Sequence, residues 1–149
     1  MKLDRIDQTI ISALTEDGRM TITDLAERVG LSKTPCTNRL RRLEESGIIR
    51  GYRPLLDHNA LGRGHIAFVQ VSLTDTKLAA LDAFDIAVRR ISEVEECHLI
   101  AGPFDYLIKV RTADISAFRT VLSERISTLP HVSHTSTFVA MAVVTDTAS

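Results

Sequence analysis

The hydrophobic pattern of the chain changes once, at the turn-rich segment DHNALGRG (57–64). Before this segment, apolar residues recur at the three- and four-residue spacing of short amphipathic helices. After it, alternating runs that favour strands are interleaved with two further helical stretches. This change of rhythm divides the 149 residues into two small domains. We expect one domain at 1–56, a linker at 57–65 and a second domain at 66–149.

Three short helices are predicted before the linker. The first begins after Asp4, the second is stopped by Gly30, and the third runs from Ser32 to about Ser46. Residues 48–56 then favour a short strand that could form a wing beside the third helix. A helix, a glycine turn and a second helix are the parts of a helix-turn-helix.

The third helix has two different faces. Cys36, Leu40 and Leu43 fall within about 60° of one another on a helical wheel, so we predict that they are buried. Pro35 falls in the first turn, where its missing N–H costs no helical hydrogen bond. Residues 33–53 hold six Lys or Arg against two Asp or Glu, although the net charge of the whole chain is −1. Such a local basic patch is typical of a small DNA-binding module; a basic face that meets only solvent is the alternative.

The polar side chains of this helix suit DNA. Arginine can bond guanine or a phosphate through two N–H groups, asparagine can pair with adenine, and serine and threonine can bond phosphate oxygens. Arg39 lies on the flank of the polar face, where it would meet a phosphate or brace the domain. The predicted DNA-binding residues are Ser32, Lys33, Thr34, Thr37, Asn38, Arg39, Arg41, Arg42 and Arg50.

The elements expected after the linker follow the order β-α-β-β-α-β. This order commonly folds as an antiparallel sheet with both helices on one face, the ferredoxin-like arrangement. We therefore predict an α+β chain in which a ferredoxin-like domain follows the helix-turn-helix domain. The expected strands cover 66–73, 94–101, 106–111 and 132–144, and the expected helices cover 77–91 and 114–128.

Neither half contains a recognisable set of catalytic or metal-binding residues. Cys36 and Cys97 form no CxxC pattern, which argues against a zinc site or a disulfide framework and leaves a bridge between chains as an alternative. Cys97 and His98 are neighbours on an expected strand and so point to opposite faces, and His131 and His134 also face apart. We expect no enzymatic activity, no cofactor and no metal.

The N-terminus carries no targeting pattern, because Asp4 and Asp7 interrupt any apolar run. No apolar stretch of 18 residues occurs either. We therefore expect a cytoplasmic protein that does not enter a membrane.

Several segments follow a known family in order and spacing over nearly the whole chain. In the first half they are LDRID (3–7), DGR (17–19), LAERVGLS (25–32), TPC (34–36), RLRRLEESGII (39–49) and GY (51–52). In the second half they are ECHLIAGPFDYLIKV (96–110) and LPHVSHTSTFV (129–139). Together they resemble the Lrp/AsnC family of leucine-responsive and asparagine-operon regulators, and look closest to its leucine-responsive branch.

This resemblance implies a winged helix-turn-helix domain followed by a ferredoxin-like domain of the Lrp/AsnC ligand-binding type. It implies a sequence-specific transcriptional regulator that binds double-stranded operator DNA and responds to a small effector such as an amino acid. It also implies homodimers that pair through the sheet and assemble further, for example to octamers.

The loop GPFDY (102–106) matches the family loop that helps to bind the effector. Backbone N–H groups and the carboxylate of Asp105 could meet the carboxylate and the amine of an amino acid. Pro103 departs from that pattern because it removes one N–H from the loop, and a plain hairpin turn is the alternative. The effector-binding residues that the resemblance implies are Gly102, Asp105, Tyr106, Thr135 and Thr137.

A function of a different class stays open at this point. The chain could be a metabolite-binding module, or a small enzyme of amino-acid metabolism, that binds no DNA. The salt dependence of DNA binding separates the two, since each phosphate contact releases counterions and makes specific binding weaker as salt rises.

Overall fold

The computed structural model describes residues 2–145 of the chain. The chain divides into two compact units, Met1–Leu55 and Leu56–Ser149. Each unit has its own hydrophobic core. Among the residues described, no helix is long and apolar enough to cross a membrane.

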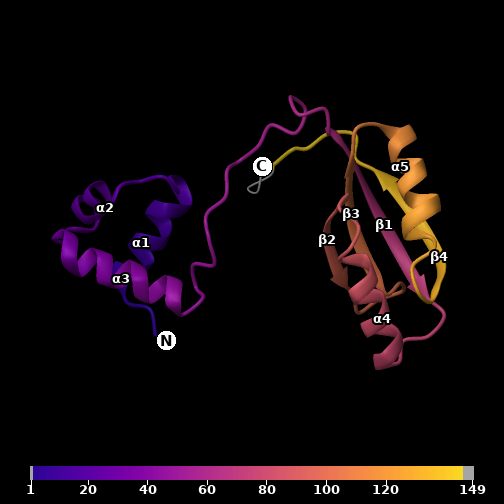
Figure 1. The fold of residues 1–149 in the computed structure, drawn as a ribbon, viewed down its shortest axis with the longest axis horizontal. Coiled ribbons are helices and arrows are strands. Elements are labelled where there is room, and N and C mark those ends of the chain that lie inside the picture. The colour runs from indigo at the N-terminus through magenta and orange to yellow at the C-terminus, as the bar shows by residue number, and fades with distance from the viewer. Residues whose placement is uncertain (1, 146–149) are drawn as a thin grey trace. The chain divides into compact units, whose positions relative to one another are not determined.

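The N-terminal unit consists of three helices: α1 (Arg5–Glu16), α2 (Ile22–Val29) and α3 (Lys33–Glu45) (Figure 1). A reciprocal capping box joins Asp4 and Asp7 at the start of α1, and this motif satisfies two of the free N–H groups there. Thr21 caps α2 by accepting from the backbone N–H of Asp24. The buried core residues of this unit are Ile10, Ala13, Leu25, Ala26, Cys36 and Leu43.

The strand predicted at 48–56 is not formed. Gly47 follows the end of α3 with a φ of 74°, a left-handed conformation that ends many helices. The N–H of Ile49 then turns back to donate to the carbonyl oxygen of Leu43 (3.1 Å). A strand needs a neighbour to satisfy its backbone groups, and the described part of the N-terminal unit contains no strand. Residues 48–56 therefore leave α3 as irregular chain.

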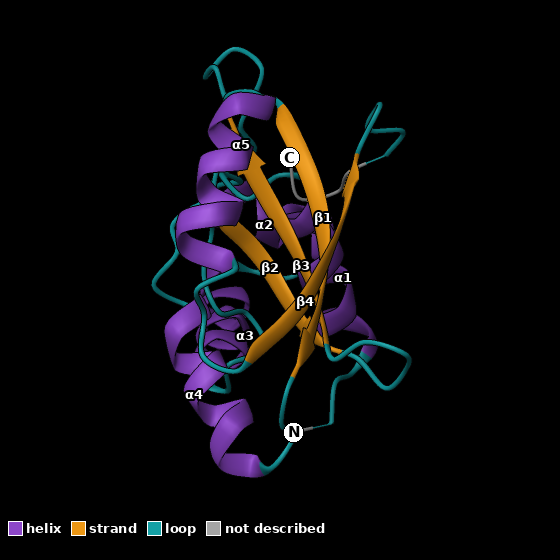
Figure 2. Ribbon diagram, turned by 90° about the vertical axis from the view of Figure 1, so that its right-hand side faces the viewer, coloured by secondary structure: helices purple, strands orange, loops and turns teal. Residues whose placement is uncertain are grey.

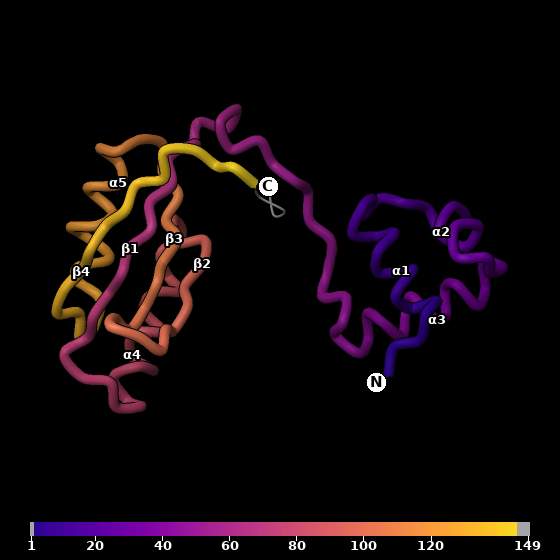
Figure 3. The backbone as a smooth tube through the Cα atoms, turned by 180° about the vertical axis from the view of Figure 1, so that it is seen from behind, coloured from indigo at the N-terminus to yellow at the C-terminus, as the bar shows by residue number. Residues whose placement is uncertain are grey.

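The C-terminal unit has the predicted order of elements. They are β1 (His65–Leu73), α4 (Leu78–Val88), β2 (Val94–Leu99), β3 (Tyr106–Thr112), α5 (Ile115–Val121), the π-helical turn η1 (Leu122–Ile126) and β4 (Val132–Val139). The four strands form one antiparallel sheet in the order β2-β3-β1-β4, and Figure 3 shows β1 between β3 and β4. The predicted ferredoxin-like arrangement is confirmed.

Helices α4 and α5 lie on the same side of the sheet (Figure 2). Alternate residues of β1, including Val69 and Val71, face these helices and are fully buried. Val69 is directly opposite Ile108 of β3 in the register. The core between the sheet and the helices is completed by Phe84 of α4 and Phe118 of α5.

Two predicted elements extend less far than expected. The last strand was predicted to reach residue 144, but β4 ends at Val139, and the last backbone bond to β1 runs from the N–H of Ala140 to Ile66 (3.0 Å). Because β1 begins at His65, the residues after Ala140 extend beyond the start of β1 and have no strand to pair with. The second helix departs from α-helical bonding at Leu122, whose carbonyl oxygen accepts from the N–H of Ser127, five residues later (2.8 Å).

The core of the C-terminal unit is predicted to depend strongly on Ile108. Replacing Ile108, which is 0% exposed, by Ala leaves a cavity and should cost about 2–5 kcal/mol of unfolding free energy. Ile86→Ala is the matched control, because Ile86 is 59% exposed on α4 and such a change should stay within about 0.5 kcal/mol. Denaturant unfolding of both variants checks this, and similar losses would contradict the assignment of Ile108 to the core.

Candidate nucleic-acid interface and effector site

Helices α2 and α3 are joined by a tight turn of fixed geometry. Gly30 ends α2 with a φ of 70°, and the N–H of Leu31 donates to the carbonyl oxygen of Ala26 (2.9 Å). Only glycine adopts this left-handed conformation without steric cost. Ser32 is the N-cap residue of α3, although its hydroxyl makes no capping hydrogen bond. The turn therefore positions α3 as the second helix of a helix-turn-helix.

Helix α3 buries one face and exposes the other. Cys36 and Leu43 are fully buried, and Leu40 is half-buried against the same core. Thr37 is half-buried, and its hydroxyl donates to the carbonyl oxygen of Lys33 (2.8 Å). The predicted DNA-binding residues that the structure leaves exposed are Ser32, Lys33, Thr34, Asn38, Arg41, Arg42 and Arg50.

Arg39 and Arg42 are attached to helix α1. Nη1 of Arg39 donates to Asp4 (2.6 Å) and to Asp7 (2.9 Å). Nη2 of Arg42 donates to both carboxylate oxygens of Asp7, at 2.9 and 2.7 Å. Arg41 and Arg42 were both predicted to bind DNA, and the contact between Arg42 and α1 was not predicted.

Asp7 is the residue of this cluster that sequence reasoning overlooked. Its side chain is 0% exposed, which is rare for a carboxylate unless it is paired. A signal was available, because Asp7 lies three residues before the buried Ile10 and so shares its face of α1. The Asp7 backbone N–H, and then the Arg39 guanidinium, also hold the pKa of the Asp4 carboxyl below its usual value.

Arg50 follows α3 in irregular chain, not in a strand. Nearby, the hydroxyl of Tyr52 donates to Oε1 of Glu44 (2.9 Å). Burial, and then this hydrogen bond to Glu44, raise the pKa of Tyr52 to about 12. Arg50 is exposed, and it lies two residues before Tyr52, whose hydroxyl is bonded to the last turn of α3.

In the C-terminal unit, the predicted effector loop is fastened to the end of β1. The N–H of Leu73 donates to Oδ2 of Asp105 (2.7 Å), and the N–H of Asp105 donates to the carbonyl oxygen of Val71 (2.9 Å). The carbonyl oxygen of Asp105 accepts from the N–H of Ile100 (2.8 Å). One carboxylate oxygen of Asp105 therefore has a structural task, while Gly102 is exposed on the loop.

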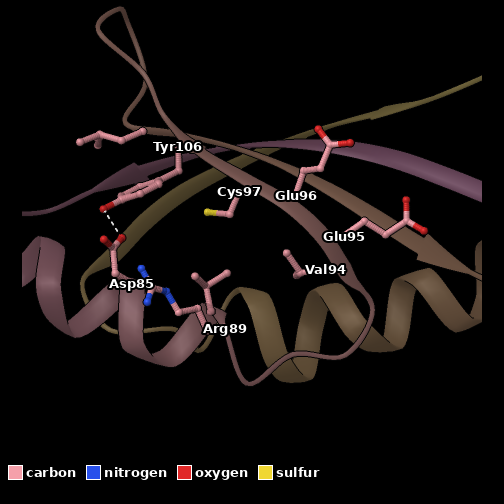
Figure 4. Close-up of a pocket in the computed structure, with 9 residues that line it drawn as sticks. Asp85, Arg89, Val94, Glu95, Glu96, Cys97 and Tyr106 are labelled. Atoms are coloured by element: carbon pink, nitrogen blue, oxygen red, sulfur yellow. Dashed lines mark hydrogen bonds between the residues drawn. The ribbon is translucent and has the colours of Figure 1, made fainter. Parts of the chain in front are cut away.

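Tyr106 points away from the loop and into the domain. Its ring stacks on Phe84 with centroids 4.2 Å apart, and its hydroxyl donates to Oδ1 of Asp85 on α4 (2.7 Å) (Figure 4). Burial and the carboxylate of Asp85 raise the pKa of the Tyr106 hydroxyl. The tyrosine side chain is therefore part of the packing between β3 and α4.

A cavity of about 390 Å³ lies between α4 and β2, next to Tyr106. Asp85, Arg89 and Cys97 line it, and Figure 4 shows these side chains around it. Burial raises the pKa of Cys97 to about 11, so this cysteine is a thiol at neutral pH and a poor nucleophile. No group of three or more possible metal ligands occurs anywhere in residues 2–145.

Thr135 and Thr137 lie on β4, opposite Val71 and Val69 of β1. Asp105 approaches the same end of β1 from the other side, through its bonds to Val71 and Leu73. The structure therefore brings Asp105 and Thr135 to the two flanks of one strand. Tyr106 on β3 is opposite Val71, as Thr135 is on β4, and its side chain points toward α4.

Comparison with known proteins gives two family matches. Residues 66–149 match the Lrp/AsnC ligand binding domain, and residues 3–50 match a winged helix-turn-helix DNA-binding domain. A proline dehydrogenase transcriptional activator from Rhizobium radiobacter is 58% identical over 97% of this chain and 93% of its own length. The leucine-responsive regulatory protein of Escherichia coli strain K12 is 44% identical over 95% of this chain and 87% of its own length.

Solved structures resemble the whole chain as well. A transcriptional regulator from Neisseria meningitidis in complex with L-Met has a TM-score of 0.91 and 33% identity, and the match covers 97% of this chain and 94% of that one. An AsnC family transcriptional regulator from Agrobacterium tumefaciens has a TM-score of 0.92 and 32% identity, covering 99% and 95% of the two chains.

The exposed face of α3 generates a direct prediction. Asn38→Ala should weaken binding to a specific DNA site by about 1–3 kcal/mol, because an amide that pairs with adenine is lost. Asn59→Ala is the matched control, since Asn59 is exposed but lies outside the three helices. Titration of labelled duplex DNA measures the affinity of both variants. Wild-type affinity in Asn38→Ala would contradict the prediction that Asn38 contacts a base.

Proposed function

Because the chain belongs to the Lrp/AsnC family of transcriptional regulators, with a DNA-binding helix-turn-helix and an amino-acid-binding domain, we propose that it activates transcription of a proline dehydrogenase gene. We further propose that proline, the substrate of that enzyme, is its effector. A catabolic enzyme is useful only when its substrate is present, so a substrate-responsive activator fits this task.

The observation that carries the proposal is the similarity to two activators of the same name. The Rhizobium radiobacter protein is 58% identical, and a second proline dehydrogenase transcriptional activator, from Rhodobacter capsulatus, is 49% identical over 97% of this chain and 94% of its own length. The leucine-responsive protein of Escherichia coli is less similar, at 44%. The residues of the two domains are thus most consistent with the proline-related regulators among these relatives.

DNA binding is proposed to use α3 in the major groove. A homodimer would place two such helices in successive grooves, about 34 Å apart, on a roughly palindromic site. The exposed Asn38 and Arg41 would meet base edges, while Ser32 and Lys33 at the start of α3 would meet the phosphate backbone. Dimers paired through the sheet would assemble further, for example to octamers.

The effector is proposed to bind near the loop 102–105 and the threonines of β4. Oδ2 of Asp105 is bonded to the N–H of Leu73, and Oδ1 is the oxygen that would accept from the amine of proline. Thr135 lies on the other flank of β1 and offers a hydroxyl. The effector can shift the regulator only by its difference in affinity between two states, typically about 1–3 kcal/mol.

The alternative is a metabolite-binding module, or a small amino-acid-metabolism enzyme, without DNA binding. The relatives named above are regulators or activators, and this favours a protein that is not an enzyme. A regulator of transcription works where bacterial DNA is, so we propose a cytoplasmic location.

The proposed target gene can be tested directly. The protein should bind a duplex from the region upstream of its own host's proline dehydrogenase gene, and L-proline should change transcription from that promoter in a reconstituted assay. L-leucine at the same concentration is the control effector, and a promoter without a binding site is the control DNA. Binding with a response to leucine instead of proline would contradict the assignment of the effector.

The role of Asp105 can be separated from its structural bond. In Asp105→Asn the side-chain oxygen can still accept from the N–H of Leu73, but the negative charge that would meet the amine is lost. We expect no response to proline and unchanged DNA binding without it. Asp75→Asn is the matched control, since Asp75 also accepts from a backbone N–H, that of Lys77. A normal response to proline in Asp105→Asn would show that the Asp105 charge does not bind the effector, and GPFDY would then be only a hairpin turn.

A further inference from the structure

The carboxylate of Asp7 is buried between α1 and α3 and holds two arginines of α3. Oδ1 accepts from Nη1 of Arg39 (2.9 Å) and from Nη2 of Arg42 (2.9 Å). Oδ2 accepts from Nη2 of Arg42 (2.7 Å) and from the backbone N–H of Asp4 (3.2 Å). Both oxygens are therefore occupied, and every partner except Asp4 comes from the helix that faces DNA.

The two ends of the Asp7–Arg42 pair lie in different environments. Asp7 has a side-chain exposure of 0%, whereas the Arg42 side chain is 50% exposed. Arg42 uses only Nη2 for Asp7, and within residues 2–145 its Nη1 and Nε groups have no hydrogen-bond partner. A guanidinium is planar, so fixing one nitrogen also fixes the directions of the remaining N–H groups. The Arg42 guanidinium is therefore held through Nη2 while the side chain stays half exposed to solvent.

We propose that Asp7 is a positioning residue for DNA binding, which holds the Arg42 guanidinium so that its outer N–H groups donate to a backbone phosphate beside the major groove. The proposal rests on α3 as the DNA-reading helix. An arginine that is already oriented loses less conformational freedom on binding than a free one, and this raises affinity. Phosphate contacts fix the register of a protein on DNA, so Asp7 would act on binding without touching DNA.

Arg41 provides an internal comparison. It neighbours Arg42 on α3 and is also exposed, but none of the hydrogen bonds of Asp7 involves it. If Asp7 acts through Arg42, the effect of changing Asp7 must vanish when Arg42 is absent and persist when Arg41 is absent. A purely structural role for Asp7 would give the same effect in both cases.

The test is a double-mutant cycle on DNA affinity. The full-length protein is used with a duplex that the wild type selects from a random pool, so the outcome does not depend on the proline dehydrogenase promoter. Asp7→Asn should weaken binding roughly tenfold in the wild type and in Arg41→Ala, but less than about twofold in Arg42→Ala. Arg42→Ala should also lower the salt slope of binding by about 0.9, the share of one phosphate.

Several outcomes would overturn the proposal. An equal loss from Asp7→Asn in wild type and Arg42→Ala would make Asp7 a structural residue only. A loss that disappears in Arg39→Ala instead would give the role to the other arginine. Thermal unfolding without DNA shows whether Asp7→Asn is folded in each background.

A second variant keeps the test valid if Asp7→Asn does not fold. Arg42→Lys retains the charge but lacks the fork that bonds Asp7 and a phosphate together. It should weaken binding roughly fivefold or more, whereas Arg119→Lys, at an exposed position on α5 of the other unit, should leave the affinity unchanged. Wild-type affinity in Arg42→Lys would overturn the proposal.

Discussion

The buried carboxylate of Asp7 is the interaction on which the arrangement of the N-terminal unit depends. A charge without access to water is costly unless it is paired and hydrogen-bonded, so α1 and α3 must stay close enough for Arg39 and Arg42 to reach it. Among the described residues of this unit, six form the buried apolar core. A unit of this size gains little from hydrophobic burial, and the ion pairs of Asp7 join α1 to α3 in addition to the aliphatic contacts of this core.

The arrangement of the C-terminal unit depends in the same way on strand β1. It pairs with β3 on one side and β4 on the other, and its inward side chains supply Ala67, Val69 and Val71 to the core. The loop before β3 and the start of β4 both meet β1 near Val71. Residues from three separate parts of the sequence thus come together at one end of one strand.

The elements with a clear hydrophobic period were predictable from sequence. All three N-terminal helices and the β-α-β-β-α-β order were found, because periodicity reports which face is buried. The strand at 48–56 was wrong because apolar and aromatic residues such as Ile48 and Tyr52 favour strands, yet a strand also needs a neighbour that local sequence does not reveal. Asp7 and Arg42 are 35 positions apart in the sequence, and no local sequence pattern predicts a hydrogen bond between residues so far apart.

Asp7 and Asp105 are both bonded within their own unit, so a variant at either position can affect folding as well as binding. The sequence alone assigned no contact to Asp7 and predicted a ligand contact for Asp105. In the structure each carboxylate accepts hydrogen bonds from distant parts of its own unit. Removing either side chain would leave buried or half-buried donors without a partner, which destabilises the fold by itself. Loss of activity in an alanine variant is therefore ambiguous at both positions. An asparagine keeps the shape and one acceptor oxygen while removing the charge, so only that change separates recognition from folding.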